Sequence, residues 1–475
     1  MILPFLLFFA APPQDDLEAN LKKLTQILVI AQSEAADPVN SENAIYQGAI
    51  PGMLRKLDPH SVFFDPGQYE QLKQMERSEQ KGFGTIVSLM PGRVVILQAM
   101  AGTPSSKAGL APGDEILAVN NIALNRLDTD QLMQLLGAAR QQQASLVVRR
   151  PGNARLLQFV LDPELVNSPS VDRIFMVRPD VGYVRVNAWE EKTGRDLKAA
   201  IEKLGGDNLK GLVLDLRANP GGAVQSAVEA AGLFLKPGQK ILSVKGRSVQ
   251  GESAEVPKTA KPYTFPLAVI INAKTASASE ILTGALQDHD RAVVVGETSY
   301  GKGLVQSVIP MSGNTAMALT TAFYYTPSGR SIQKPLETGQ LEFAPSKEEY
   351  HTDSGRVVRG GGGIQPDYAV TPALQTRLRV ALEVSGAFTS FATEYTQKNK
   401  IGDDFQVAPA LLDDFKVYVS ERGIQPPVGE WSVDRDWIQS RLQQEILNQG
   451  LSVAKGDEVE AQRDPQVRAA LEHLK

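Results

Sequence analysis

The feature that most constrains this chain is the regular alternation of strand-like and helix-like segments from about residue 180 onward. The strand-like segments are short continuous apolar runs, as expected for strands that are buried on both faces of a sheet. Each run is followed by a segment whose apolar residues have helical spacing. This alternation predicts a parallel βαβ sheet. We expect strands at 181–186, 211–216, 267–272 and 292–296, and helices at 194–204, 223–235 and 277–289.

The regions on either side of this core have other patterns. Residues 15–80 carry apolar residues three and four positions apart, which predicts helices, and Pro51 predicts two short helices in place of one. Residues 81–165 contain short β-rich runs between Gly and Pro turns, with one helix near 129–139, which predicts a small barrel or sandwich. The sequence from 373 to 475 is again polar and helical.

Composition excludes several classes of function. A chain of 475 residues with 42% hydrophobic content has room for three or four compact units. Its net charge of -5 and its lack of any Lys/Arg cluster argue against a nucleic-acid partner. The absence of cysteine excludes disulfides, thiolate metal sites and a cysteine nucleophile. The four histidines have no spacing typical of metal ligands, so we expect no metal site.

The N-terminal residues bear on the compartment of the protein. Residues 2–11 form a continuous apolar run that suits the core of a signal peptide and is too short to span a bilayer. No Lys or Arg precedes the run, which departs from the usual signal, and a buried N-terminal strand is the alternative. We expect residues 1–14 to be a signal peptide, either cleaved or retained as an anchor. The protein is then exported, to the periplasm or to the outer side of the inner membrane.

The segment 276–280 offers a nucleophile. Ser277 follows an apolar strand and begins a helix, where N–H groups and the positive end of the helix dipole favour an alkoxide and its oxyanion product. The alternative is structural, because a serine followed three residues later by Glu280 is also a capping box. From this segment alone the capping interpretation is the stronger one.

Lys302 is the candidate base for this serine. Lysine can take a proton from serine only when the amine is neutral, which burial among apolar residues favours. Glycines on both sides of Lys302 allow close backbone approach, and the amide oxygen of Gln306, four residues on, can orient the amine. In isolation, a solvated turn lysine is the commoner case.

Two other chemistries fit less well. Residues 296–302 match the first seven positions of a phosphate-binding P-loop, but Gly303 stands where Ser or Thr should hold magnesium. The residues after Gly303 also alternate like a strand, whereas a P-loop requires a helix there. A Ser-His-Asp triad would need His289, which closes the helix that Ser277 begins. We therefore expect neither a nucleotide site nor a histidine base.

Two glycine-rich segments offer backbone N–H groups. Gly221 and Gly222 form a tight turn at the carboxyl end of a buried strand, where open α/β sheets place their sites. This turn either completes an oxyanion hole or only connects a strand to a helix. Residues 81–85, with 109–114 after them, look like a PDZ domain, whose loop presents amides to the C-terminal carboxylate of a peptide. For the loop alone, an ordinary hairpin glycine pair is the alternative.

Taken together, these segments resemble the carboxyl-terminal processing (tail-specific) serine proteases, which contain a PDZ domain. The resemblance extends over most of the chain, and its motifs occur in the family's order and separations. It is carried by residues 52–54, 57–61, 215–219, 276–280, 301–303, 324–331 and 363–367.

The resemblance implies a role for each candidate residue. Ser277 would be the nucleophile, Lys302 its base, and Gln306 the residue that orients the lysine. No metal and no cofactor is required. The implied oxyanion hole consists of backbone N–H groups of Gly221, Gly222 and Ala278, and the implied loop for the substrate C-terminus consists of Gly82, Phe83, Gly84 and Thr85.

The resemblance also implies the architecture and the activity. The fold would be a multidomain α/β protein, with a ClpP/crotonase-like α/β protease core, an inserted PDZ β-barrel and helical N- and C-terminal regions. The expected function is a serine endopeptidase that cleaves proteins near a free C-terminal tail held by the PDZ domain; a non-catalytic PDZ scaffold is the alternative. Pairing of two subunits and an adaptor protein stay open. The expected domains are 1–14 (signal peptide), 15–80 (helical), 81–165 (PDZ), 166–372 (protease core) and 373–475 (helical).

Overall fold

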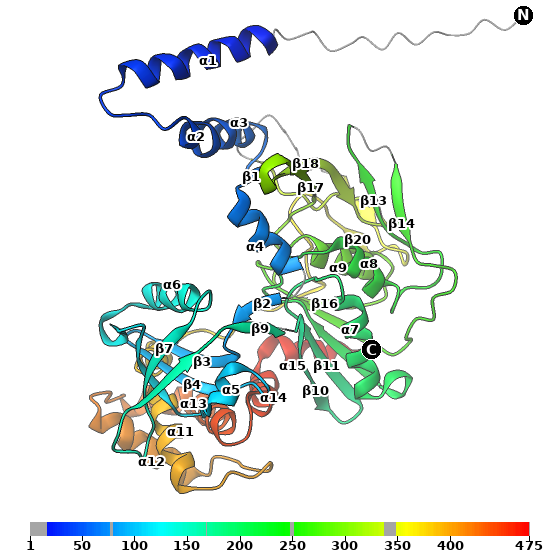
Figure 1. Ribbon diagram of the computed structural model, residues 1–475. Coiled ribbons are helices and arrows are strands. Elements are labelled where there is room, and N and C mark those ends of the chain that lie inside the picture. The colour runs from blue at the N-terminus through cyan, green and yellow to red at the C-terminus, as the bar shows by residue number, and fades with distance from the viewer. Residues whose placement is uncertain (1–16, 77–78, 168, 248–250, 337–347, 475) are drawn as a thin grey trace, which may run out of the picture. The chain divides into compact units, whose positions relative to one another are not determined.

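The computed structural model describes residues 17–76, 79–167, 169–247, 251–336 and 348–474 (Figure 1). The predicted signal peptide, residues 1–14, lies outside these described residues. The chain divides into two compact units, and each is described by itself. The smaller unit consists of residues 1–69, 306–320 and 336–342, and the larger unit consists of residues 70–305, 321–335 and 343–475.

The larger unit is built on a six-stranded sheet. Every residue of two central strands, 211–215 and 267–271, is buried, which accounts for their continuous apolar sequence. The first strand is antiparallel to its neighbour and all other neighbours are parallel, so the predicted βαβ core is confirmed. In spatial order the strands are β10 (Val171–Arg178), β11 (Val181–Val186), β12 (Gly211–Asp215), β15 (Leu267–Ile271), β16 (Val293–Gly296) and β21 (Tyr368–Ala369).

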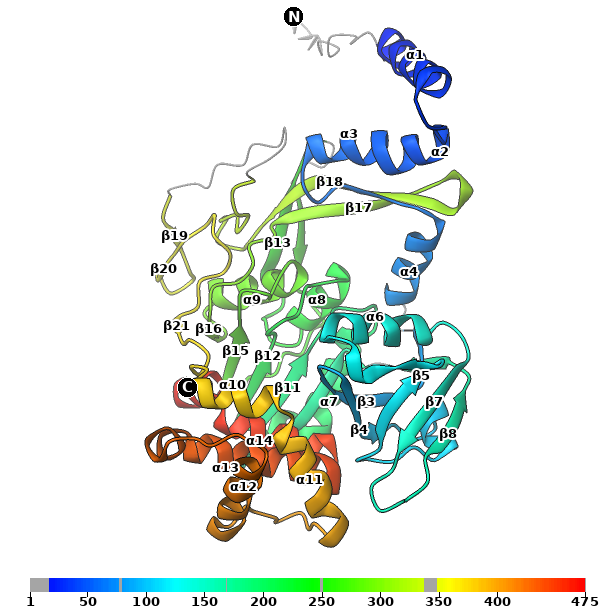
Figure 2. The same ribbon diagram turned by 90° about the vertical axis from the view of Figure 1, so that its left-hand side faces the viewer.

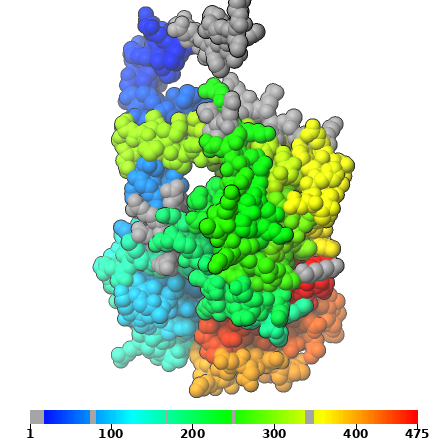
Figure 3. Space-filling view, turned by 90° about the vertical axis from the view of Figure 1, so that its right-hand side faces the viewer, coloured from blue at the N-terminus to red at the C-terminus, as the bar shows by residue number. Residues whose placement is uncertain are grey.

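Helices cover both faces of this sheet (Figure 2). On one face, α7 (Thr193–Leu204), α8 (Val224–Ala231) and α9 (Ala278–Asp288) share a hydrophobic core with the strands. On the other face, α14 (Val453–Arg463) and α15 (Pro465–His473) pack against the strand side chains that point to that face. Figure 3 shows the red C-terminal segment lying directly against the green core. The end of the chain is therefore part of the packing of this sheet.

A second sheet contains the longest strand of the described chain. In the larger unit, β13 (Lys240–Lys245) pairs antiparallel with β14 (Glu252–Glu255) and with the last residues of β18 (Thr315–Tyr325). β18 also pairs with β17 (Leu304–Met311), so the strand that was predicted after Gly303 is confirmed. Within the smaller unit, β18 pairs with β1 (Val62–Phe64). The sequence did not predict β1, β13 or β14, because these strands are short or partly exposed.

The β-rich region forms a domain with its own hydrophobic core in the larger unit. Its strands form an antiparallel sheet in which β3 is at the edge. The predicted helix is confirmed as α6 (Thr129–Ala139). The strand that leads into the domain, β2 (Glu79–Gly82), pairs antiparallel with the strand that leads out, β9 (Glu164–Asn167). In spatial order the sheet consists of β3 (Thr85–Met90), β4 (Arg93–Ala99), β5 (Glu115–Val119), β7 (Ala144–Arg149) and β8 (Leu157–Leu161), with β6 (Ile122–Ala123) on β5.

The predicted C-terminal helices form a further core of their own. Phe388, Phe391 and Phe415 are buried at its centre, and the ring of Phe415 contacts the other two. The helices are α10 (Arg377–Val384), α11 (Ala387–Lys398), α12 (Pro409–Glu421) and α13 (Val428–Gly450).

The N-terminal region is helical, as predicted, but its second helix differs from the expectation. The prediction that Pro51 separates two helices is wrong, because residues 41–57 are helical throughout. A π-helical turn, Ala44–Ala49, leads directly into the turn with the proline, and such a turn accommodates a residue without an N–H group. Among the residues that the structure describes, no helix is long and apolar enough to cross a membrane. The helices are α1 (Leu17–Glu34), α2 (Ser41–Asn43), α3 (Ile50–Leu57) and α4 (Pro66–Glu76).

Candidate active site

Ser277 lies in a sharp turn between β15 and α9. Its backbone has φ 55° and ψ -117°, a conformation that is strained for a residue with a side chain. A strained strand-to-helix turn is typical of nucleophilic serines in α/β folds, because it exposes the hydroxyl above the carboxyl ends of the strands. The side chain is only partly buried. The turn therefore suits a nucleophile better than an ordinary helix cap.

The Ser277 turn is held against the loop that follows the neighbouring strand, β12. The hydroxyl of Thr275 donates to the carbonyl oxygen of Leu216 at 2.9 Å, and the N–H of Ala276 donates to that of Asn219 at 3.0 Å. The carboxyl ends of two adjacent parallel strands thus meet at this point, where open α/β sheets place their sites.

The Gly221-Gly222 turn packs directly on this serine. A Cβ atom added at Gly221 would lie 2.7 Å from the Cβ of Ser277, and one added at Gly222 would lie 2.0 Å from the carbonyl oxygen of Trp189. The N–H of Gly221 donates to the side chain of Asn219 at 2.9 Å. Within the described residues, the N–H groups of Gly222 and Ala278 meet no hydrogen-bond acceptor. The turn therefore brings two unpaired N–H groups close to Ser277.

The carboxylate of Glu280 ties Ser277 to the loop that carries Lys302. It accepts hydrogen bonds from the N–H groups of Ser277 at 2.8 Å, Gly301 at 2.7 Å and Lys302 at 2.9 Å. It also accepts one from the hydroxyl of Ser299. Burial raises the pKa of Glu280, whereas these four hydrogen bonds favour the charged form. The sequence identified Glu280 only as a capping partner, and its bonds to the lysine loop show a larger role in positioning.

Tyr324 links the same two residues from the other strand system. Its hydroxyl donates to the carbonyl oxygen of Lys302 at 2.6 Å and lies 3.1 Å from that of Ser277. Burial raises the pKa of Tyr324 well above its ordinary value, so the phenol stays neutral and can donate. Nothing in the sequence marked Tyr324 for this role, because its contact with the site depends on the pairing of β18.

The two residues beside Lys302 are glycines because neighbouring segments lie too close to them for a side chain. A Cβ atom at Gly301 would lie 2.7 Å from the side chain of Lys334, and one at Gly303 would lie 2.9 Å from the backbone nitrogen of Gln333. Lys302 itself is partly buried between them. The chain thus packs tightly around the lysine, as the sequence suggested.

Gln306 and His289 each have contacts of their own. Gln306 belongs to the smaller unit, where its amide donates to the carbonyl oxygen of His60 at 2.6 Å. Its role toward Lys302 stays a prediction. His289 caps the C-terminal end of α9, and its ring nitrogens lie 2.8 Å from a carboxylate oxygen of Asp353 and 2.7 Å from the carbonyl oxygen of Lys240. It is therefore at the opposite end of the helix from Ser277.

A buried charge cluster supports the loop after β12. Asp215 accepts from the hydroxyl of Tyr183 at 2.6 Å and from the guanidinium of Arg217. Burial alone would raise the pKa of Asp215, but Arg217 and these hydrogen bonds lower it. Arg217 also donates to Asp464 at 2.5 Å and to Gln466 at 2.9 Å. The cluster fastens the start of α15 to the carboxyl end of β12.

Comparison with known proteins assigns the family. Residues 180–370 match peptidase family S41, and residues 95–150 match a PDZ domain. A carboxy-terminal-processing protease of Bartonella bacilliformis is 36% identical over 301 residues, which cover 62% of this chain and 68% of that protein. This chain belongs to peptidase family S41.

Two further similarities extend over most of this S41 chain. A carboxyl-terminal-processing protease of Synechocystis is 33% identical over 356 residues, which cover 71% of this chain and 82% of that protein. A solved structure titled photosystem II D1 C-terminal processing protease is 25% identical, with a TM-score of 0.41 over 74% of this chain and 86% of that chain. The resemblance to serine proteases with a PDZ domain, inferred from the motifs, is confirmed.

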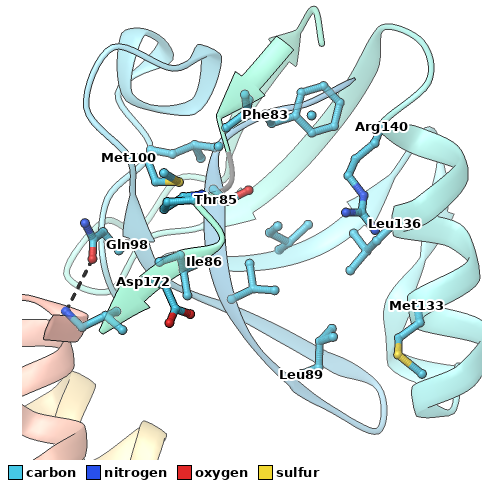
Figure 4. A pocket seen from close by; sticks show the side chains of 18 of the residues that line it. Phe83, Thr85, Ile86, Leu89, Gln98, Met100, Met133, Leu136, Arg140 and Asp172 are labelled. Atoms are coloured by element: carbon cyan, nitrogen blue, oxygen red, sulfur yellow. Dashed lines mark hydrogen bonds between the residues drawn. The ribbon is translucent and has the colours of Figure 1, made fainter. Parts of the chain in front are cut away.

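The PDZ domain of this S41 peptidase borders a groove of about 830 Å³ (Figure 4). The predicted loop, 82–85, lines one end of it. Gly84 has φ 71°, and a Cβ atom there would lie 2.3 Å from Thr103, so only glycine fits. Within the described part of the chain, the N–H groups of Phe83 and Gly84 meet no acceptor. The loop thus has the unpaired donors that an anionic group requires.

Arg140 is a groove residue that the sequence did not identify. It follows the last turn of α6, and its side chain passes over Gly82, whose added Cβ would lie 3.6 Å from the Arg140 Cδ. Apolar side chains of α6, including Met133 and Leu136, line the groove beside it (Figure 4). The groove therefore combines a positive end with an apolar wall.

Proposed function

We propose that this S41 protein is an endopeptidase in which Ser277 is the nucleophile and the neutral amine of Lys302 is the general base. The observation that carries the proposal is the position of Glu280, whose carboxylate accepts hydrogen bonds from the backbones of both residues. The strained turn at Ser277 and the partial burial of Lys302 support the same assignment. Gln306 would orient the amine.

The reaction then runs in two halves. The hydroxyl proton of Ser277 passes to the Nζ of Lys302 as the Oγ attacks the carbonyl carbon of the scissile peptide bond. The resulting ammonium returns the proton to the departing amine, which leaves an ester on Ser277. The neutral amine of Lys302 then takes a proton from water, which attacks this ester and releases the new C-terminus.

The oxyanion of each tetrahedral intermediate needs donors that are already in place. We assign this role to the unpaired N–H groups of Gly222 and Ala278, aided by the positive end of the α9 dipole. The N–H of Gly221 is bonded to Asn219 in this conformation, so Gly221 contributes chiefly by its lack of a side chain. Its role as a donor stays a prediction.

Substrate selection belongs to the PDZ groove. A free C-terminal tail would add as a strand to the open edge of β3, with its carboxylate on the N–H groups of Phe83 and Gly84 and near the guanidinium of Arg140. This arrangement makes proteins and peptides with free C-termini the substrates. Export, to the periplasm or to the outer side of the inner membrane, is a further part of this proposal that rests on the sequence alone, and pairing of subunits and use of an adaptor stay open.

The test uses the full chain and an unstructured protein that ends in an apolar tail, either free or amidated, with products followed by mass spectrometry. We expect cleavage of the free-tailed protein, slower cleavage of the amidated one, and none by Ser277→Ala or Lys302→Ala. Lys274→Ala is the matched control, because Lys274 is an exposed lysine in the same turn and should be dispensable.

Each contrary result has a definite meaning. Cleavage that persists in Ser277→Ala would refute the assignment of the nucleophile. Loss of cleavage in Lys274→Ala, with Lys302→Ala active, would move the base to Lys274. Tail binding by all forms without any cleavage would favour the non-catalytic scaffold.

A further inference from the structure

The groove beside the PDZ domain has a second side that the tail-capture proposal does not use. Opposite α6, it is lined by Asp172 and Arg173 of β10, Arg185 of β11 and Asp457 of α14. We call these four residues the charged lobe. All of them lie in the same compact unit as the PDZ domain.

The charged lobe lies on one particular face of β3. Val87 and Leu89 of this strand pack into the PDZ core, so Ile86, which directly precedes Val87, points to the other face. Ile86 pairs with Gln98 of β4, whose side chain accepts from the N–H of Val453 at 3.4 Å, at the start of α14 (Figure 4). Asp457 follows one helical turn later, and Figure 4 shows Asp172 beside Ile86. The lobe therefore borders the outer face of the strand that would receive the tail.

Strand geometry decides which tail residue reaches the lobe. In a tail added to β3, successive side chains point to opposite faces, and residues directly opposite each other share a face. The last residue, whose carboxylate is held by the loop, would point toward the apolar wall of α6. The second-to-last residue would then point to the face of Ile86 and the charged lobe.

Together with Glu460, which also contacts Arg173, the lobe has three acids against two arginines. Asp172 is matched by Arg185, whose Nε donates at 2.8 Å, and Asn187 adds a further bond at 3.1 Å. Arg173 is shared between two acids, Asp457 at 2.8 Å and Glu460 at 3.0 Å. Of these two acids, only Asp457 lines the groove. Among the described residues, Arg173 is the one cation that forms an ion pair with Asp457.

We infer that Asp457 is a specificity-determining residue, which favours a basic side chain at the second-to-last position of the captured tail. The ammonium or guanidinium of that side chain would supply the counter-charge that Arg173 divides between two acids. This inference rests on the proposed function, since it requires a tail that binds along β3.

The titration of Asp457 agrees with an incomplete set of partners. Burial raises its pKa to about 6, and Glu460 and Asp172 add to this effect, while Arg173 and Arg185 oppose it. These are the charged groups that face it from β10, β11 and its own helix. The preference for a basic residue should therefore weaken as the pH falls below about 6, where Asp457 takes up a proton.

The test measures tail binding by the full chain carrying Ser277→Ala, so that no probe is cleaved. The probes are fluorescent peptides that end in one apolar residue and differ only in a Lys, Gln or Glu before it. At pH 7.5 we expect the Lys peptide to bind about tenfold more tightly than the Glu peptide, with Gln between them, as for a partly exposed charge pair. In Asp457→Asn the three affinities should converge, and Asp457→Glu should restore the order.

Controls separate the outcomes. Glu458→Gln alters the next residue of α14, which pairs with Lys455, and should leave the preference intact. Equal binding of Lys and Glu peptides by the parent protein, or a preference that survives in Asp457→Asn, would overturn the inference while tail capture stands. Failure of all three peptides to bind would instead overturn tail capture. Melting temperatures of the variants show whether each remains folded.

Discussion

The Ser277 turn contains a fully buried carboxylate, Glu280, and the PDZ groove a partly buried one, Asp457, and the two are satisfied in different ways. Glu280 accepts hydrogen bonds from three N–H groups and one hydroxyl, all from the same compact unit. Asp457 shares the guanidinium of Arg173 with Glu460. Burial raises the pKa of both, yet only Glu280 has a complete set of donors. The difference separates a site that is finished before substrate arrives from one that substrate would complete.

This contrast extends to the backbone. At the Ser277 turn, the neighbouring loops and strands fix the serine in a strained conformation, and such a fixed geometry would suit the proposed reaction, whose charge always develops at the same point. In the groove, the edge of β3 and the N–H groups of Phe83 and Gly84 have no partner within the part of the chain that the structure describes. Such a surface gains its hydrogen bonds only with a ligand. Mutations in the two regions should therefore affect different measurements.

The largest effect should come from Arg217→Ala. This change leaves Asp215 buried without its counter-charge and removes the bonds to Asp464 and Gln466. Breaking a buried ion pair by removing one partner costs about 3–5 kcal/mol, so the free energy of unfolding should fall by that amount in denaturant titrations. Arg178→Ala is the control, since Arg178 is exposed and makes one long bond to the same helix. Equal stability of the two variants would contradict the role of the cluster.

Glu280→Gln tests the completeness of the catalytic site. The amide presents two donors where the carboxylate accepted four hydrogen bonds, so the Ser277 and Lys302 backbones lose their common anchor. We expect kcat/KM to fall about 10²–10³-fold, the range for losing one precisely placed polar group in an active site. Tail affinity, measured in a Ser277→Ala background, should not change. A variant with normal turnover would show that Glu280 is only a helix cap.

Gly84→Ala should affect the groove and spare the chemistry. The added methyl group would collide with Thr103, and the backbone at φ 71° disfavours any side chain. Loss of the carboxylate loop should weaken tail binding by about tenfold or more, a cost of about 1.4 kcal/mol. Cleavage of a short peptide with a blocked C-terminus should continue at its normal rate. Gly102→Ala is the matched control, because Gly102 has φ 78° but open space around it.

The smallest expected effect concerns pH. The folded-state pKa of Asp457 is about 6, above its ordinary value of 3.8, so the folded protein binds this proton more tightly than the unfolded chain. Its contribution to stability therefore rises as the pH falls from about 6 toward 3.8, by about 1 kcal/mol after allowance for solvent screening. Denaturant titrations at intervals from pH 7 to pH 4 should show this rise, relative to Asp457→Asn. Parallel curves for the two proteins would contradict the raised pKa.

The sequence predicted the parts of the site that follow from strand order. Ser277 and Lys302 come after β15 and β16, which are adjacent parallel strands, so their carboxyl ends meet at one edge of the sheet. The apolar runs of these strands and the glycines around the lysine were visible in the chain. Family membership followed from the same motifs.

Long-range pairing placed the residues that the sequence did not identify. Tyr324 reaches the site because the end of β18 pairs with β13, and no local pattern encodes that pairing. Arg140 and Asp457 face the groove from segments more than three hundred residues apart. The prediction at Pro51 was wrong for the opposite reason. It applied the local rule that proline interrupts a helix, but a π-helical turn before Pro51 accommodates the missing N–H group. Local chemistry was thus readable, and contacts made by tertiary packing were not.

The pairing of β2 with β9 has an evolutionary consequence. Because Glu79 lies opposite Asn167 and Gly82 opposite Glu164, the PDZ domain leaves and rejoins the core at a single place. A domain whose two ends lie side by side can be exchanged or deleted by recombination without disturbing the fold of the core. Lineages could then acquire new substrates by replacing one module, and the hydrolytic machinery would be inherited unchanged.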